Sequence, residues 1–187
     1  MAEDPLAELA DLAARVGARC GALGLRVATV ESCTGGLVGH LITEVPGSSA
    51  YFVGGFVTYS DELKRQAVGV PDEVLAAHGA VSAQVALAMA SGGRERTAAD
   101  LAVSVTGIAG PDGGSPSKPV GLTYVAVADA SGAVVQRHVW TGDRAENKRR
   151  SAAAALELLL ERIDAQPAAP EEASDTTSDP VAAPDAT

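Results

Sequence analysis

The sequence predicts an α/β fold in which strands and helices alternate. Of the 187 residues, 47% are apolar, with many Ala and Val, which is enough for one domain with a proper core. Two β-strand patterns also run directly into helical patterns through polar turns. In a parallel sheet, two such junctions lie at the same carboxyl edge, where α/β proteins bind their ligands.

The first junction is the stretch Glu31-Ser-Cys-Thr-Gly-Gly36. The run Leu25–Val30 before it is typical of a β-strand, and the pattern over 37–44 predicts a helix. A Gly-Gly turn that enters a helix leaves backbone N–H groups unpaired, so it can bind an anion or support a nucleophile. Residues 32–34 supply three candidate nucleophiles. The alternative is a structural N-cap followed by two glycines.

Two further segments belong to this N-terminal part. The spacing of apolar residues predicts a covering helix over Asp4–Arg19, which Gly21 and Gly24 end before the first strand. A turn at Pro46–Ser49 then leads toward the second strand.

The second junction follows a strand predicted over Gly54–Tyr59 from its β-branched and aromatic residues. Ser60 can cap a short helix over Asp61–Val68, whose first turn is acidic. Lys64 lies one helical turn beyond Ser60. Tyr59 and Lys64 are therefore expected to flank this junction as Ser32 does the first.

The middle of the chain predicts two helices, a buried strand and a glycine-rich loop. The helices span Pro71–His78 and Ser82–Arg96, with Gly79 as terminator, and the strand spans Leu101–Val105. The loop Thr106–Gly114 contains four glycines and cannot be core, because glycine adds no packing. It is either a connector or a segment whose backbone closely approaches a ligand.

The C-terminal part predicts a β-hairpin and a long helix. Val120–Asp129 and Val134–Trp140 alternate around a turn, and Asp143 or Thr141 caps a helix that ends at Ile163. Arg144, Lys148, Arg149 and Arg150 crowd the start of this helix, where cations oppose the helix dipole. This cluster is either an anion-binding feature or a solvated basic face.

Composition narrows the classes of partner. The net charge of −10 argues against nucleic acid, which needs clustered cations. Cys20 and Cys33 form no disulfide framework, the three histidines lack metal-ligand spacing, and no run is long enough to span a membrane. We therefore expect a reduced, cytoplasmic protein with no metal, no cofactor and no membrane. Residues 166–187 are rich in Ala, Pro and acids, and predict a disordered tail.

Seven motifs together carry a resemblance to a known family. They are Glu31-Ser-Cys-Thr-Gly-Gly36, Gly47-Ser-Ser49, Gly55-Phe-Val-Thr-Tyr-Ser60, His78-Gly-Ala-Val-Ser82, Thr106-Gly-Ile-Ala-Gly-Pro-Asp-Gly-Gly114, Lys118-Pro-Val-Gly121 and Gly142-Asp-Arg144. In this order they resemble the CinA C-terminal domain family, whose stand-alone bacterial members are nicotinamide-nucleotide amidases. The resemblance implies a three-layer α/β/α domain over residues 1–165 with a five-stranded mixed sheet. It also implies hydrolysis of nicotinamide mononucleotide to nicotinate mononucleotide and ammonia in pyridine-nucleotide recycling, and by analogy a homo-oligomer.

The resemblance also assigns site residues. Its catalytic serine, lysine and tyrosine fall on Ser32, Lys64 and Tyr59. Amide hydrolysis needs a nucleophile, a base, donors for the oxyanion and an acid for departing ammonia. A lysine serves as the base only when the site lowers its pKa. The residues expected to bind substrate are Thr34, Gly35, Gly36, Ser48, Ser49, Thr106, Gly107, Gly110, Arg144 and Arg149.

Two other functions remain open at this point. One is a non-catalytic domain that acts in competence or DNA-damage responses through protein partners. The other is an amidase for a different small carboxamide. The joint presence of Ser32, Tyr59 and Lys64 favours an enzyme, because a domain that only binds a partner does not need all three.

Overall fold

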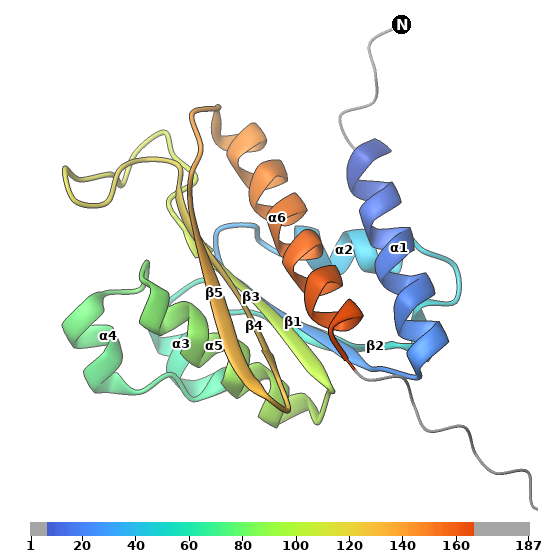
Figure 1. The fold of residues 1–187 in the computed structure, drawn as a ribbon. Coiled ribbons are helices and arrows are strands. Elements are labelled where there is room, and N and C mark those ends of the chain that lie inside the picture. The colour runs from blue at the N-terminus through green and yellow to red at the C-terminus, as the bar shows by residue number, and fades with distance from the viewer. Residues whose placement is uncertain (1–6, 167–187) are drawn as a thin grey trace, which may run out of the picture.

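A single five-stranded sheet organises the molecule, seen in a computed structural model that describes residues 7–166 (Figure 1). The strands are β1 (Val27–Glu31), β2 (Phe52–Val57), β3 (Leu101–Gly107), β4 (Leu122–Asp129) and β5 (Gly132–Val139). Their order is β2-β1-β3-β4-β5. β2, β1 and β3 are parallel, whereas β4 and β5 run antiparallel to their neighbours. The mixed sheet expected from the family resemblance is therefore confirmed.

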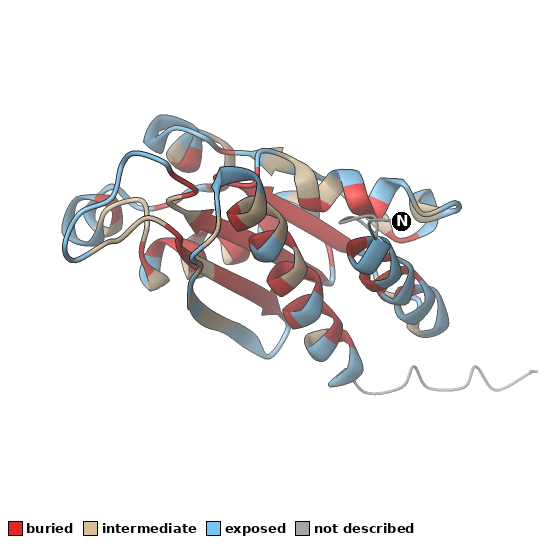
Figure 2. Ribbon diagram, turned by 90° about the horizontal axis from the view of Figure 1, so that it is seen from above, coloured by how far each residue is buried: buried red, intermediate tan, exposed pale blue. Residues whose placement is uncertain are grey.

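Helices cover both faces of the sheet. They are α1 (Ala7–Leu23), α2 (Leu37–Thr43), α3 (Asp61–Val68), α4 (Asp72–His78), α5 (Ala83–Thr97) and α6 (Arg144–Asp164), with a 3-10 turn η1 (Ser48–Ala50). α1, α2 and α6 pack together on one face, and α3 and α4 pack on α5 on the other. Figure 2 shows the sheet buried between these layers. The three-layer α/β/α class is confirmed.

Buried apolar side chains explain why each layer stays in place. Leu12, Val16 and Cys20 of α1 meet Leu156 and Leu159 of α6 in the larger core cluster. On the opposite face, a smaller cluster of buried apolar side chains forms under α5. It includes Val30 of β1. Burial of such side chains contributes about 1.5–3 kcal/mol each, so the two clusters fix the helices against the sheet.

Element boundaries differ from the sequence prediction mainly at glycines. α1 continues through the exposed Gly21 to Leu23, because one exposed glycine costs a helix only about 1 kcal/mol. Gly24, with a φ of 65°, is where the helix actually ends. The expected start at Asp4 lies outside the described residues. β1 and β2 are also shifted, by two residues, relative to the starts predicted at Leu25 and Gly54.

The predicted helix caps are mostly confirmed. The Ser60 side chain accepts a hydrogen bond from the Leu63 N–H at the start of α3. Of the two residues considered for α6, Asp143 is the cap, and its Oδ1 accepts from the Glu146 N–H at 2.8 Å. The disordered tail predicted for 166–187 lies outside the described residues, except for Gln166. No helix among residues 7–166 is long and apolar enough to cross a membrane.

Candidate active site

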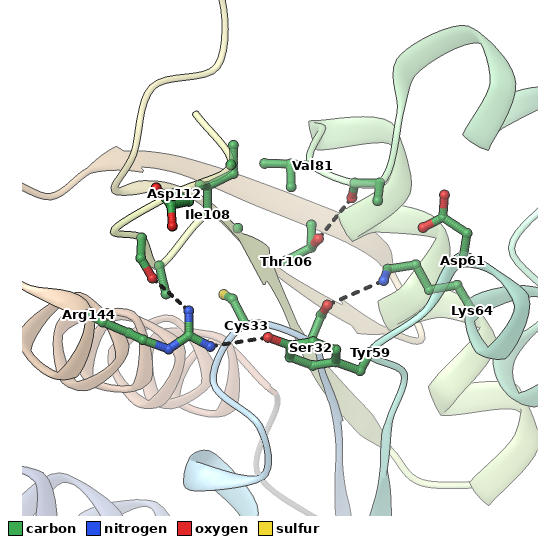
Figure 3. Close-up of a pocket in the computed structure, with 15 residues that line it drawn as sticks. Ser32, Cys33, Tyr59, Asp61, Lys64, Val81, Thr106, Ile108, Asp112 and Arg144 are labelled. Atoms are coloured by element: carbon green, nitrogen blue, oxygen red, sulfur yellow. Dashed lines mark hydrogen bonds between the residues drawn. The ribbon is translucent and has the colours of Figure 1, made fainter. Parts of the chain in front are cut away.

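A pocket opens where the parallel strands end. Its volume is about 270 Å³, near the lower limit of about 300–1,000 Å³ for small-molecule sites. Ser32 and Cys33 after β1, Tyr59 and Lys64 around the start of α3, and the loop 106–113 line it. Figure 3 shows these groups converging from three separate segments. The expectation that both strand-to-helix junctions face one site is confirmed.

Lys64 and Ser32 are in direct contact inside this pocket (Figure 3). The Lys64 Nζ donates to Ser32 Oγ at 3.3 Å and to the Thr58 carbonyl oxygen at 2.9 Å. Lys64 is only 1% exposed, and both of its acceptors are neutral. Burial therefore lowers the pKa of the Lys64 ammonium below its usual value, although the nearby Asp61 carboxylate opposes the shift. A lysine in this state can lose its proton and accept one from a hydroxyl.

Arg144 connects the start of α6 to two other walls of the pocket. Its Nη1 donates to the Gly110 carbonyl oxygen at 2.7 Å, and its Nη2 donates to the Tyr59 hydroxyl at 3.2 Å. Tyr59 is 60% exposed, and its hydroxyl accepts this bond, so its own O–H can still donate into the pocket. Asn147, one turn further along α6, donates to the Ala109 carbonyl oxygen. The contacts of Arg144 with Gly110 and of Asn147 with Ala109 hold the basic start of α6 beside the glycine-rich loop.

The glycine-rich loop lies directly against the pocket, which is the position that the second interpretation of this segment requires. Thr106 and Gly107 line the cavity, and Thr106 Oγ1 is committed to the Ala80 carbonyl oxygen at 2.8 Å. Gly110 has a φ of 86°, and a Cβ there would lie 2.5 Å from Val120 Cγ1. Only glycine fits this turn, which presents its carbonyl oxygen to Arg144.

Three backbone N–H groups at the start of α2 are already in use. Those of Gly36, Val38 and Gly39 donate to the Glu31 carboxylate, so Gly36 offers no free donor to a substrate. Thr34 is 1% exposed, and its Oγ1 has no hydrogen-bond partner among the described residues. Within the turn 32–36, the N–H groups that donate to no other described residue are those of Cys33 and Thr34. These two, beside Ser32, are the donors left for an oxyanion.

Six residues expected to bind substrate do not line the pocket: Thr34, Gly35 and Gly36, which directly follow Cys33 in the chain, and Ser48, Ser49 and Arg149. Ser48 and Ser49 form η1, which precedes β2 and therefore lies at the opposite edge of the sheet from Ser32. Their hydroxyls suggested a binding role in the sequence, but the helix α2 carries the chain across the molecule before they occur. Arg149 makes no hydrogen bond or ion pair with any of residues 7–166.

Lys148, which the sequence analysis placed in the basic cluster but not among the substrate-binding residues, is the basic residue that faces the nucleophile turn. Its Nζ lies 3.6 Å from the position that a Cβ on Gly35 would occupy. It lies four residues after Arg144, hence on the same face of α6. Arg144 belongs to the family motif Gly142-Asp-Arg144. A basic residue four positions after it was the signal in the sequence that could have identified Lys148.

Cys33 lines the pocket beside Ser32 but has the properties of a packing residue. Burial raises the pKa of its thiol to about 12, so the nucleophilic thiolate is scarce near neutral pH. Both cysteines are buried and unpaired. Ser32 is therefore the better nucleophile of the two, because a base lies within reach of its hydroxyl.

The fold and the pocket define a three-layer α/β/α protein with a hydroxyl, a buried ammonium and a guanidinium gathered at the carboxyl edge of its parallel strands. The chain belongs to the CinA C-terminal domain family, whose model matches residues 9–163.

Its relatives are of two lengths. It is 49% identical over 157 residues to the nicotinamide-nucleotide amidohydrolase PncC of Escherichia coli (strain K12), covering 83% of this chain and 95% of that protein. It is 51% identical over 146 residues to a CinA-like protein of Chloroherpeton thalassium, of which the match covers only 35%. This chain therefore spans about a third of the length of the longer relatives.

Solved structures agree with the fold. The competence/damage inducible protein CihA of Agrobacterium tumefaciens superposes with a TM-score of 0.79 at 44% identity, over 84% of this chain and 96% of that one. A CinA superfamily protein of Klebsiella pneumoniae gives a TM-score of 0.80 at 34% identity, over 83% and 97%.

Proposed function

We propose that this chain is an amidohydrolase that converts nicotinamide mononucleotide into nicotinate mononucleotide and ammonia. The observation that carries the proposal is the contact of the buried Lys64 Nζ with Ser32 Oγ, at 3.3 Å inside the pocket. Similarity to the E. coli amidohydrolase along 95% of its length supports this substrate.

The first half of the proposed reaction forms an ester on the protein. Neutral Lys64 takes the proton of the Ser32 hydroxyl as Oγ attacks the carboxamide carbon. The resulting oxyanion accepts hydrogen bonds from the Cys33 and Thr34 N–H groups, and one such donor is worth roughly 10²–10³ in rate. The carbon–nitrogen bond then breaks, and the nitrogen leaves as ammonia with the proton held by Lys64. Tyr59, whose O–H is free to donate, assists this proton transfer.

The second half restores the serine. Water attacks the ester carbon and gives one proton to the neutral Lys64, which returns it to Ser32 Oγ as the ester bond breaks. The sum is amide plus water to carboxylic acid plus ammonia, so no other reactant is needed. The lowered pKa of Lys64 serves both halves because each begins with the neutral amine.

The substrate's phosphate needs a cation away from the reacting amide, and Arg144 and Lys148 are the proposed pair. Arg144 is bound to neutral oxygens, not to a carboxylate. Lys148 forms no ion pair with the described residues and faces Gly35. Binding energy from this remote group helps position the amide. We expect nicotinamide riboside and nicotinamide to be poorer substrates by about a hundredfold, or about 3 kcal/mol.

Lys148→Ala is expected to lower kcat/KM for the nucleotide by about tenfold or more, since a charge-assisted contact contributes about 1.5–3 kcal/mol. The riboside, which lacks the phosphate, should be unaffected. Arg150→Ala is the matched control, because Arg150 is paired with Glu146 on the same helix. Arg149→Ala tests the cation expected from the sequence. Equal losses for nucleotide and riboside in Lys148→Ala would show that this lysine does not bind the phosphate.

The proposal is tested by ammonia release from the nucleotide, the riboside, nicotinamide and unrelated small carboxamides. We expect the nucleotide to be the best substrate, and Ser32→Ala to abolish turnover while the fold persists. Ser32 is 7% exposed and loses one hydroxyl in this variant. Preference for another carboxamide would move the function to a different amidase. Substantial turnover by Ser32→Ala would remove Ser32 as nucleophile.

A further inference from the structure

Glu31 is the last residue of β1 and the immediate neighbour of Ser32. It is 1% exposed, and its strand is buried along its whole length. Its carboxylate makes no ion pair within residues 7–166. Its hydrogen bonds come from backbone N–H groups: Gly36 at 3.0 Å and Val38 at 3.1 Å to Oε2, and Gly39 at 2.8 Å to Oε1.

A buried acid without a cation is costly unless its oxygens are well supplied with donors. Here the three N–H groups at and after the Gly35-Gly36 turn provide them, at the positive end of a short helix. Hydrogen bonds to an ionised oxygen are roughly twice as strong as neutral ones. The side chain therefore ties the end of β1 to the start of α2 and closes the loop that contains Ser32.

The backbone of Glu31 reaches the base as well. Its carbonyl oxygen accepts a hydrogen bond from the Thr58 N–H at 2.7 Å, and the Thr58 carbonyl oxygen accepts from Lys64 Nζ at 2.9 Å. The Ser32 N–H is held separately by the Val105 carbonyl oxygen at 2.9 Å. One residue thus connects the turn that carries the nucleophile with the strand end that holds the lysine.

We propose that Glu31 is a positioning residue, whose carboxylate holds the 32–36 turn so that Ser32 Oγ faces Lys64 and the Cys33 and Thr34 N–H groups face the carbonyl oxygen of the reacting amide. The inference rests on the proposed amidohydrolase function. It also implies that the start of α2 is closed to anions of the substrate, because the protein's own carboxylate accepts from the Gly36, Val38 and Gly39 N–H groups and would repel a second anion there. The phosphate then depends on α6.

The test compares Glu31→Gln and Glu31→Ala with the wild type. Gln keeps the shape but places an N–H₂ donor against backbone N–H donors, and Ala removes the acceptor altogether. We expect kcat to fall by roughly tenfold to a hundredfold, as for a misplacement of about 1 Å, with KM little changed. Glu44→Gln and Glu44→Ala, at the exposed far end of α2, are matched controls that should leave kcat unchanged.

Chemical rescue separates positioning from mere stability. Glu31→Ala leaves a space the size of acetate beside three free N–H groups, so added acetate or formate should raise its kcat several-fold. The same concentration of chloride should not, and neither acid should affect the wild type. Glu31→Gln with wild-type kcat would overturn the proposal. So would a folded Glu31→Ala whose kcat no carboxylate restores.

A second readout is independent of the substrate. The rate at which a fluorophosphonate reagent modifies Ser32 depends on the positions of the nucleophile, the base and the oxyanion donors together. We expect this rate to be slower in both Glu31 variants and to be restored by acetate in Glu31→Ala. If the wild type reacts with the reagent but does not hydrolyse the nucleotide, the proposed function fails and the positioning role stands. Equal modification rates in all variants would refute the positioning role itself.

Discussion

Two buried charges at opposite edges of the sheet have opposite surroundings. Lys64, beside the carboxyl ends of β1 and β2, is 1% exposed and bonds to neutral oxygens. Asp129, at the far end of β4, has a side chain that is also 1% exposed, but it pairs with Arg162. Ser131 and Gln166 donate to the same carboxylate.

The surroundings decide what each charge does. Burial alone would raise the pKa of the Asp129 carboxyl, but hydrogen bonds from Ser131 and Arg162 outweigh it and hold the pKa below its usual value. Burial of Lys64 outweighs the opposing effect of the Asp61 carboxylate, so the pKa of Lys64 falls and the neutral amine becomes accessible. The paired charge stabilises the fold, and the unpaired one is suited to chemistry.

The largest effect is expected at Lys64, the charge without an ion-pair partner among the described residues. Lys64→Arg should lose about 10²–10⁴-fold in kcat/KM, nearly as much as Lys64→Ala, because guanidinium keeps the charge but cannot act as a base. Wild-type kcat/KM should rise with pH through the lowered pKa of Lys64. Arg65→Lys, on the same helix but paired with Glu62, is the control. Restored turnover in Lys64→Arg would mean that the role of Lys64 is electrostatic.

The next effect is on stability, at the paired charge. Asp129→Asn should lower the free energy of unfolding by about 2–3 kcal/mol and leave turnover unchanged. Because the folded pKa is lowered, the difference from wild type is fully present above the unfolded pKa of about 3.9 and disappears as pH falls through the folded value.

Denaturant titrations at several pH values measure this difference. Asp164→Asn, which breaks the exposed pair with Arg19, is the control and should cost under about 1 kcal/mol. A difference that persists unchanged at the lowest pH, or a loss of turnover in Asp129→Asn, would contradict the contrast between the two edges.

The sequence predicted the alternation of strands and helices and the placement of Ser32 and Lys64 at one edge of the sheet because both follow from local rules. Strand patterns that enter capped helices place their junctions at one edge, and Ser60 caps α3 so that Lys64 lies one turn on. The three-layer arrangement with a five-stranded mixed sheet, and the roles proposed for Ser32, Lys64 and Tyr59, came from the family resemblance. Periodicity alone does not specify which strands are neighbours.

What the sequence did not predict depends on long-range geometry. Ser48 and Ser49 looked like binding residues, but they follow a helix that carries the chain to the other edge. Glu31 was interpreted as part of a turn, although an acid that ends a buried strand needs hydrogen-bond donors. One of its donors is the Gly36 N–H, which had been assigned to substrate. Which backbone donors remain free is settled only once all side chains are placed.

The smallest effect is expected at the C-terminal end of α6, where Gln166 extends the Asp129 cluster. Its Nε2 donates to Asp129 Oδ2 at 3.1 Å and to the Arg162 carbonyl oxygen at 3.0 Å. Gln166→Ala should therefore lower the free energy of unfolding by about 1 kcal/mol. Truncation after Gln166 should change neither thermal midpoint nor turnover, because 167–187 offer almost no apolar side chains to bury.

Truncation after Ala165 removes Gln166 as well and should match Gln166→Ala, which locates the loss in that one amide. Thermal melts of the three proteins and the wild type, run beside ammonia assays, measure this. A lower midpoint after truncation at Gln166 would show that residues beyond it stabilise the domain. Lost turnover there would mean that the paired edge influences the pocket, and the separation between a stabilising edge and a reactive edge would be wrong.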